Sequence, residues 1–156
     1  MLRKAALVVL WILSFELIGL LLGFITSANI ETWYAFLKKP ALTPPAIVFS
    51  TVWPILYAML ALVGYSLCQR PRTSKTNTAI TLYSLQMLMN WLWTILFFYF
   101  HLIGFSLLWI IVMAVLTLVT IFLTKSQFKL TTLMILPYFI WLLFAVYLNA
   151  AIWIMN

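Results

Sequence analysis

The sequence predicts an all-α membrane protein, a bundle of five transmembrane helices with a long first loop that contains a short helix. Of its 156 residues, 67% are hydrophobic and only 7% are charged, whereas a soluble domain carries about 25% charged residues. The hydrophobic residues form five runs of about 20 residues, which is the length that crosses a bilayer. Each run is expected to be a helix, because in lipid every backbone N–H and C=O must be bonded within the segment.

The five expected spans belong to one domain of residues 1–156. They are placed at residues 5–25, 46–67, 79–100, 104–124 and 130–154. The joints after the second, third and fourth spans are too short to fold independently, so successive helices are expected to be antiparallel neighbours in one bundle. The basic start before the first span is also compatible with a secretory signal peptide, but the long apolar run and Glu16 in its middle favour a retained helix.

Residues 26–45, between the first and second spans, are expected to form a loop that covers one end of the bundle as a lid. Within it, residues 30–37 are expected to form a short helix with Asn29 as its N-cap, and Pro40 ends that helix because the residue before a proline avoids the α region. The Pro44-Pro45 pair then leads into the second span, since proline is tolerated in a first helical turn. An alternative interpretation is that the aromatic residues of this loop are ordinary members of an interfacial belt.

The nine Lys and Arg residues give a net charge of +7. They lie in short loops rather than along one helix face, so the charge does not indicate nucleic-acid binding. Seven of them are expected on the side of the membrane that holds the N-terminus, including the groups that follow the second span at Arg70 and the fourth span at Lys125. Only Lys38 and Lys39 are expected on the other side. This asymmetry predicts a cytoplasmic N-terminus, with the first loop and the C-terminus on the opposite side of the membrane.

Several classes of site are excluded by the residues that the chain contains. A single cysteine, Cys68, and a single histidine, His101, allow neither a disulfide within the chain nor a multi-histidine metal site, so no metal is expected. His101 is expected to be a solvated or snorkelling residue at a helix end, and the alternative is an axial ligand of haem. The sequence holds no phosphate-binding loop, GxSxG, HExxH or paired carboxylates, which excludes the corresponding kinase, hydrolase and metalloprotease chemistry.

Three of the expected spans carry a stripe that combines aromatic residues with amides or small residues at helical spacing. The stripes are Trp53, Tyr57, Ala61 and Gly64 on the second span, Gln86, Asn90, Trp93 and Phe97 on the third, and Pro137, Trp141, Ala145, Leu148 and Asn149 on the fifth. Amides in a membrane span are expected to face the bundle interior or a cavity. Aromatic walls, small residues and a few amides are typical of a pocket for a flat, largely apolar ligand. The alternative is helix–helix contact, with small residues allowing close approach and amides bonding between helices.

Glu16 is the only carboxylate expected within a span, and such a residue is by default a candidate for proton or cation handling. No Lys, Arg or His lies within an expected span to pair with it, so the plainer interpretation is a protonated side chain bonded to a neighbouring helix. Gly19 and Gly23 form a GxxxG pattern, which marks the close approach of another helix within the chain or in a dimer.

Four motifs, in order along nearly the whole chain, resemble those of the translocator protein family, TspO or peripheral benzodiazepine receptor, and the chain is similar to its bacterial-type members. The first-loop motif is Trp33-Tyr34-x-x-Leu37-x-Lys39-Pro40 followed by Thr43-Pro44-Pro45, and the second-span motif is Trp53-Pro54-x-Leu56-Tyr57. The third-span motif is Gln86-x-x-x-Asn90-x-x-Trp93 followed by Phe97-Phe98. The fifth-span motif is Pro137-Tyr138-x-x-Trp141-x-x-x-Ala145-x-x-Leu148-Asn149, ending in Trp153-x-x-Asn156.

The resemblance implies a five-helix bundle, usually dimeric, with a pocket between the helices that the first loop caps. It implies tetrapyrrole ligands, protoporphyrin or haem, and synthetic isoquinoline-carboxamide and benzodiazepine compounds, bound without a further cofactor. The implied ligand-binding residues are Tyr34, Pro44, Trp53, Tyr57, Asn90, Trp93, Trp141, Ala145 and Leu148, and the implied lid residues are Trp33, Lys39, Pro40 and Pro45.

The resulting functional hypothesis is a membrane receptor or transporter-like protein for tetrapyrroles. A second hypothesis is a light- and oxygen-dependent porphyrin-degrading enzyme in which Trp53 and Trp141 are the catalytic redox partners. A third is a membrane scaffold that binds only lipid and partner proteins. Two residues depart from the family pattern: Leu42 stands where the family often has Trp, and Tyr147 is followed by no Lys or Arg, so cholesterol binding is not expected.

Overall fold

The computed structural model describes residues 2–126 and 128–156 and contains five long helices. Their bounds are α1 Leu2–Ile30, α2 Ala46–Cys68, α3 Ser74–Thr94, α4 Ile103–Thr124 and α5 Lys129–Met155, with a 3-10 turn, η1, at Tyr34–Phe36 and a π-helical turn, η2, at Ile95–Tyr99. All five are long and apolar enough to cross a membrane, which confirms the predicted fold class. The chain is therefore an integral, multi-pass membrane protein.

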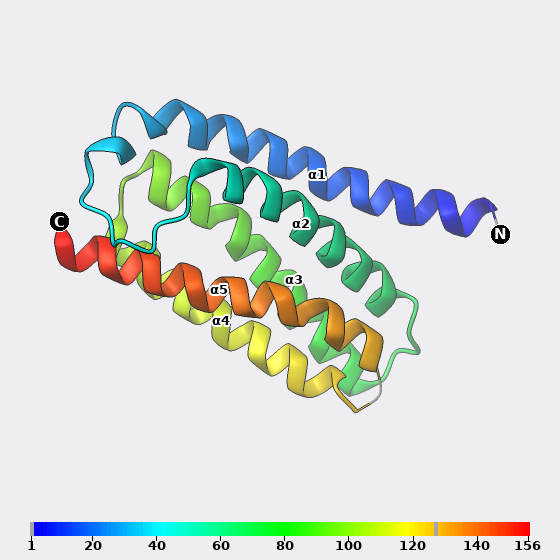
Figure 1. Cartoon of the computed structure of the whole chain (residues 1–156). Coiled ribbons are helices and arrows are strands. Elements are labelled where there is room, and N and C mark those ends of the chain that lie inside the picture. The colour runs from blue at the N-terminus through cyan, green and yellow to red at the C-terminus, as the bar shows by residue number, and fades with distance from the viewer. Residues whose placement is uncertain (1, 127) are drawn as a thin grey trace.

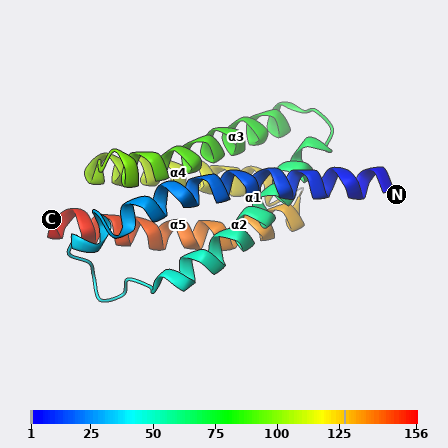
Figure 2. The same ribbon diagram turned by 90° about the horizontal axis from the view of Figure 1, so that it is seen from above.

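The five helices form one antiparallel bundle in which α1 lies on the outside (Figure 1 and Figure 2). Helix α1 packs mainly against α2, α2 packs in turn against α5, and α4 lies between α3 and α5. The N-terminus and the C-terminus lie at opposite ends of the bundle, and the loop between α1 and α2 lies at the end that holds the C-terminus (Figure 1). The long first loop and the short joints after it thus have the arrangement predicted from the sequence.

The first loop is shorter than predicted because α1 continues to Ile30. The Thr26 hydroxyl donates to the Leu22 carbonyl at 3.1 Å, and the Asn29 amide donates to the Ile25 carbonyl at 2.8 Å. Polar side chains that bond to carbonyls one turn back remain within a helix instead of ending it. The prediction that Asn29 is the N-cap of a short helix over residues 30–37 is therefore wrong, and only the 3-10 turn η1 forms there.

Helix α3 begins at Ser74, earlier than the predicted 79, because Thr73 caps it. The Thr73 hydroxyl oxygen accepts a hydrogen bond from the Thr76 backbone N–H at 3.1 Å, which satisfies one of the free donors of the first turn. At its other end α3 passes into the π-helical turn η2, and the chain then turns at His101, whose φ of 57° lies in the left-handed region. Such turns and backbone outliers often accompany functional sites.

Buried polar side chains join the helices across the interior. The Tyr83 hydroxyl donates to the Leu60 carbonyl at 2.6 Å between α3 and α2, and the Asn149 amide donates to the Ile103 carbonyl at 2.9 Å between α5 and α4. Groups of this kind are stable in hydrocarbon because they are bonded. Large apolar side chains remain exposed on the outer faces of all five helices, where a surrounding membrane covers them.

Candidate functional site

The side-chain amide of Asn90 lies at the centre of the bundle and joins three helices. It accepts a hydrogen bond from the Tyr57 hydroxyl of α2 at 3.1 Å and donates one to the Tyr138 hydroxyl of α5 at 3.0 Å. Asn90 is 3% exposed and Tyr138 is fully buried. A bonded chain of this kind in a low-dielectric interior fixes the orientation of each member. The three stripe-bearing helices therefore meet at one polar point.

Aromatic rings extend from this point along the boundary between α2 and α5. The Trp53 ring lies 5.4 Å from the Tyr57 ring and 6.5 Å from the Trp141 ring, with the two indoles edge to face at 87°. Phe49 lies one turn before Trp53, and its ring centroid is 5.8 Å from that of Trp141. We call Phe49, Trp53, Tyr57 and Trp141 the α2–α5 aromatic cluster. Such edge-to-face pairs are favourable beyond their buried area, so the two predicted redox tryptophans are in direct contact.

A second group of rings joins α3 and η2 to the first loop. Trp93 stacks on Phe97 with the ring centroids 5.0 Å apart. The Phe97 centroid lies 5.4 Å from that of Trp33 and 6.2 Å from that of Tyr34. Phe98, the next residue of η2, contacts both loop rings as well. The wider turn of a π-helix changes the direction of consecutive side chains, which accounts for two neighbouring phenylalanines reaching the same loop. We call Trp33, Tyr34, Trp93, Phe97 and Phe98 the loop cluster.

His101 anchors the first half of the loop. Its ring stacks on Trp33 at 4.1 Å with an interplanar angle of 19°, and its Nε2 lies 3.4 Å from Asn29 Oδ1. The left-handed backbone of His101 is strained for a residue with a Cβ. These contacts give His101 a structural role in addition to the solvated position that was predicted for it.

Asn156, just past α5, anchors the second half of the loop. Its Oδ1 accepts from the Lys38 N–H at 2.9 Å, and its Nδ2 donates to the Lys38 carbonyl at 3.0 Å. Lys39 is held within the loop, because its Nζ donates to the carbonyls of Ala35 and Leu37 and lies 4.7 Å above the Tyr34 ring. Burial raises the pKa of the Tyr34 phenol above its ordinary value, so Tyr34 is neutral at physiological pH.

The structure brings together four of the predicted ligand-binding residues, Trp53, Tyr57, Asn90 and Trp141, and places two others, Tyr34 and Trp93, in the loop cluster. Ala145 and Leu148 follow Trp141 on α5, half-buried and buried respectively. Among the loop residues, the Pro40 carbonyl accepts from Thr43 and exposed Pro45 precedes α2, while Pro44 is half-buried between them.

Tyr138, Phe49 and Asn156 are among the residues of this region that the predicted site did not include. Tyr138 belongs to the quoted fifth-span motif, yet nothing in its spacing indicated that it would bond to Asn90. Phe49 carries no polar group that would single it out from the apolar run. Asn156 contacts a residue 118 positions away, a pairing that no local pattern indicates.

Polar atoms remain available on the Asn90 face of α3. The Trp93 indole N–H and the Gln86 Oε1 are buried and have no hydrogen-bond partner within residues 2–126 and 128–156. Buried polar groups are nearly always bonded in folded proteins. An indole donor and an amide acceptor that are free on either side of Asn90 are therefore suited to contacts with a ligand.

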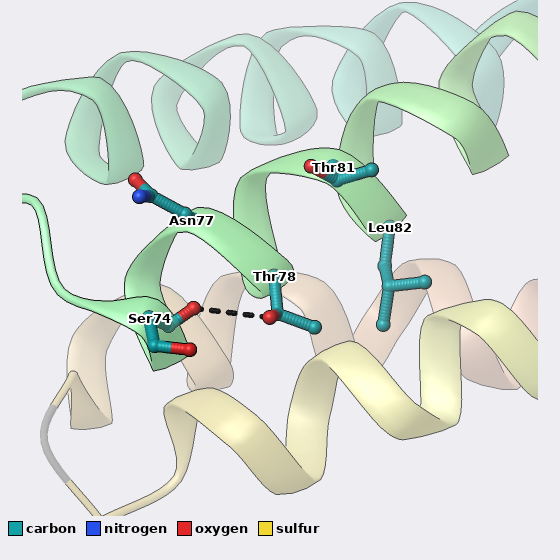
Figure 3. Close-up of a pocket in the computed structure, with 5 residues that line it drawn as sticks. All are labelled: Ser74, Asn77, Thr78, Thr81 and Leu82. Atoms are coloured by element: carbon teal, nitrogen blue, oxygen red, sulfur yellow. Dashed lines mark hydrogen bonds between the residues drawn. The ribbon is translucent and has the colours of Figure 1, made fainter.

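Two shallow depressions on the outer surface lie away from these residues. One, of about 470 Å³, is lined by Ser74, Asn77, Thr78, Thr81 and Leu82 on the outside of α3 (Figure 3). Within it, Thr78 donates to the Ser74 carbonyl at 3.0 Å (Figure 3), so part of its polarity is already used by the helix. The other, of about 530 Å³, lies on α1 and is lined by Leu13, Glu16, Leu17 and Leu20.

Replacing Asn156 with alanine is expected to release the second half of the loop while the bundle stays folded. The amide makes two hydrogen bonds to the Lys38 backbone, and the loss of about 1.4 kcal/mol from two such bonds corresponds to an open population of the loop that is about tenfold larger. Hydrogen exchange of loop amides around Lys38, measured by mass spectrometry, checks this result. Asn77→Ala, an exposed amide on α3, is the control, and equal exchange in both variants would contradict the anchoring role.

Similarity to known proteins extends over nearly the whole chain, including these regions. A family model described as the TspO/MBR family matches residues 8–154. The chain is 34% identical to the tryptophan-rich protein TspO of Archaeoglobus fulgidus, over 93% of this chain and 94% of that protein. It is 28% identical to the translocator protein of Sus scrofa, over 90% and 86% of the two chains, and 29% identical to protein CrtK of Rhodobacter capsulatus, over 80% and 78%.

Proposed function

The chain belongs to the TspO/MBR family, and on that premise we propose that it is a membrane receptor that binds a tetrapyrrole, protoporphyrin or haem, between α2, α3 and α5 and beneath the first loop. The observation that carries the proposal is the convergence of three helices on Asn90. Asn90 is bonded to Tyr57, whose ring adjoins Trp53 and through it Trp141, and the free polar atoms of Gln86 and Trp93 belong to the same helix as Asn90. Synthetic isoquinoline-carboxamide and benzodiazepine compounds, which are also flat and largely apolar, fit the same chemistry.

The α2–α5 aromatic cluster supplies the surfaces that a flat macrocycle needs. A porphyrin ring stacks favourably on indole faces, and a few buried polar atoms are enough to orient it. Trp53 and Trp141 are in contact, so a ligand of this size enters only if the two rings separate. The loop cluster and Asn156 hold the first loop above that boundary. Separation of the two indole rings is therefore expected to be coupled to movement of the first loop.

Saturable quenching of tryptophan fluorescence by protoporphyrin tests this proposal. The Trp53→Phe/Trp141→Phe variant is expected to bind protoporphyrin about tenfold more weakly than the unmodified chain, which corresponds to about 1.4 kcal/mol. Phenylalanine preserves the apolar contact but offers a smaller stacking surface than indole. Binding is read from both the remaining tryptophans and the absorbance of the porphyrin, so the loss of two fluorophores does not mimic loss of affinity.

Trp153→Phe is the matched control, because Trp153 lies on α5, is 56% exposed and is remote from Trp141 along the helix. Its affinity is expected to equal that of the unmodified chain. Equal affinity in all three proteins would overturn the proposed site. Quenching that never saturates in any of them would favour the scaffold that binds only lipid and partner proteins.

The contact between Trp53 and Trp141 favours porphyrin degradation as a second candidate function. In this candidate the photo-excited porphyrin loses one electron to dioxygen, which gives superoxide and an oxidised ring, and two adjacent indoles beside the ring are suited to relay that electron. The discriminating measurement is the rate at which porphyrin absorbance falls in air under light. Loss that is faster than with an inert membrane protein, and that slows in the Trp53→Phe/Trp141→Phe variant, supports the enzyme, while equal loss leaves the receptor.

A further inference from the structure

Two short joints of the chain meet at the end of the bundle that holds the N-terminus (Figure 1). One lies between α2 and α3, and the other lies between α4 and α5. The Lys75 Nζ, beside the first joint, donates to the Ser126 hydroxyl of the second at 3.2 Å, and the Arg70 guanidinium lies 4.7 Å from the centre of the Phe128 ring. Positive side chains of both joints therefore share one surface, and we call Arg70, Arg72, Lys75, Lys125 and Lys129 the joint cluster.

Neither joint contains an acidic residue that could balance this positive charge. The chain has two acidic residues, Glu16 and Glu31. Glu16 lies in the middle of α1, and Glu31 follows the end of α1 at the opposite end of the bundle, where the C-terminus also lies (Figure 1). Positive charges gathered on one surface repel one another, and an anion between them is attracted to each. An anion that balances the joint cluster must therefore come from outside the chain.

Contacts within the chain orient three members of the joint cluster and leave donors free for an anion. A lysine ammonium has three N–H donors, and the bond to the second joint uses one of those of Lys75. Arg70 and Lys125 are exposed and lie over aromatic rings, and a cation is attracted to a ring face by its charge rather than through its donors. Since Lys and Arg donate strong charge-assisted hydrogen bonds to phosphate, a phosphate group suits this surface.

An exposed apolar stripe of α4 begins beneath Lys125, whose Nζ lies 4.3 Å from the centre of the Phe122 ring. The stripe follows helical spacing, which places its members on one face, and they are 37% to 58% exposed. Its members are Leu108, Ile111, Val112, Val115, Leu118, Val119 and Phe122. A phospholipid covers such a stripe with an acyl chain while its phosphate reaches the cations, whereas a free phosphate ion gains only the second contact.

We propose that the joint cluster binds an anionic phospholipid, with the phosphate between the two joints and an acyl chain along the α4 stripe. Each Lys or Arg near an anionic membrane surface strengthens association about fivefold. The headgroup of phosphatidylcholine carries a positive charge of its own, which the cluster repels, so the site favours phosphatidylglycerol. This inference is independent of the tetrapyrrole proposal, because the joint cluster and the first loop lie at opposite ends of the bundle (Figure 1).

The preference for anionic lipid is measured in phosphatidylcholine bilayers that hold the full chain and a trace of spin-labelled lipid. The fraction of label that the protein immobilises gives its relative affinity for each headgroup. The unmodified chain is expected to favour spin-labelled phosphatidylglycerol over spin-labelled phosphatidylcholine at least about fivefold. Lys75→Gln/Lys125→Gln is expected to lose this preference. Lys75→Arg/Lys125→Arg is expected to keep it, because arginine retains both the charge and the N–H donors.

Arg3→Gln/Lys4→Gln is the matched control, because it removes the same charge from the same end of the bundle. Both residues lie in the first turn of α1, which extends past the two joints (Figure 1 and Figure 2). The preference is expected to remain in this variant. An equal loss in both glutamine variants would mean attraction to the whole basic surface and would overturn the site, as would the absence of any preference in the unmodified chain.

Two changes of solution test the same site without a substitution. Raising the salt concentration to about 1 M, where exposed charges are screened beyond about 3 Å, is expected to remove most of the preference for phosphatidylglycerol. Inorganic phosphate added at constant ionic strength is expected to leave the preference unchanged, because the free ion gains nothing from the α4 stripe. A preference that resists salt would overturn a site based on charge, and displacement of the labelled lipid by inorganic phosphate would overturn phospholipid as its occupant.

Discussion

Replacing Asn90 with alanine is expected to lower the free energy of unfolding by about 1–2 kcal/mol. The amide is bonded to the hydroxyls of Tyr57 and Tyr138, and both hydroxyls lose that partner in the variant. A buried hydroxyl without a partner costs about 1–3 kcal/mol in water-soluble proteins and less in membrane bundles, where hydrogen bonds between helices average about 0.6 kcal/mol. Unfolding in mixed micelles with increasing fractions of SDS measures the change.

Asn77→Ala is the matched control for this measurement. Asn77 lies on the same helix, but its side chain is exposed on the outer face near the start of α3 (Figure 3). Its replacement is expected to change stability by less than about 0.5 kcal/mol. If Asn90→Ala and Asn77→Ala shift the unfolding transition equally, the Tyr57–Asn90–Tyr138 chain does not hold the three helices together. Protoporphyrin affinity is expected to fall in Asn90→Ala as well, since Tyr57 is no longer fixed beside Trp53.

The position of Asn90 could be predicted from the sequence because helical spacing decides which side chains share a face. Gln86, Asn90 and Phe97 are all buried, and Trp93 is half-buried with its indole nitrogen inside. A polar residue in a membrane span faces inward for energetic reasons, so one amide orients the whole stripe. The same reasoning places Tyr57, Ala61 and Gly64 of α2 inside the bundle, as observed.

The stripe on α5 shows what helical spacing alone does not predict. Its members divide among different surroundings: Pro137 is exposed, Trp141 contacts Trp53, and Asn149 bonds to the start of α4. Tyr138, one residue from Pro137 and therefore on another face, is the one that reaches Asn90. Periodicity gives the direction of a side chain relative to its own helix, but the neighbouring helix that it meets depends on how all five pack. Long-range contacts such as that of Asn156 with Lys38 likewise leave no local pattern.

The two glycines of α1 are identical in the sequence pattern and differ only in what surrounds them. Gly19 faces the Tyr57 ring, and Gly23 faces open space. Tyr57 is buried and its hydroxyl is bonded to Asn90, so the ring is not free to move aside. Any side chain at position 19 must therefore push α1 away from α2 or break the bond to Asn90. The contact links the outermost helix to the centre of the proposed ligand site.

Gly19→Ala is accordingly expected to lower the free energy of unfolding by about 2 kcal/mol, within the range for overpacked interiors. The added Cβ would lie 2.6 Å from two carbons of the Tyr57 ring, and displacement of that ring is also expected to weaken protoporphyrin binding. Gly23→Ala is the control, and it is expected to keep full affinity and to gain up to about 1 kcal/mol, since alanine is the better helix former. Unfolding in mixed micelles and fluorescence quenching measure both properties, and equal behaviour of the two variants would mean that α1 does not press on Tyr57.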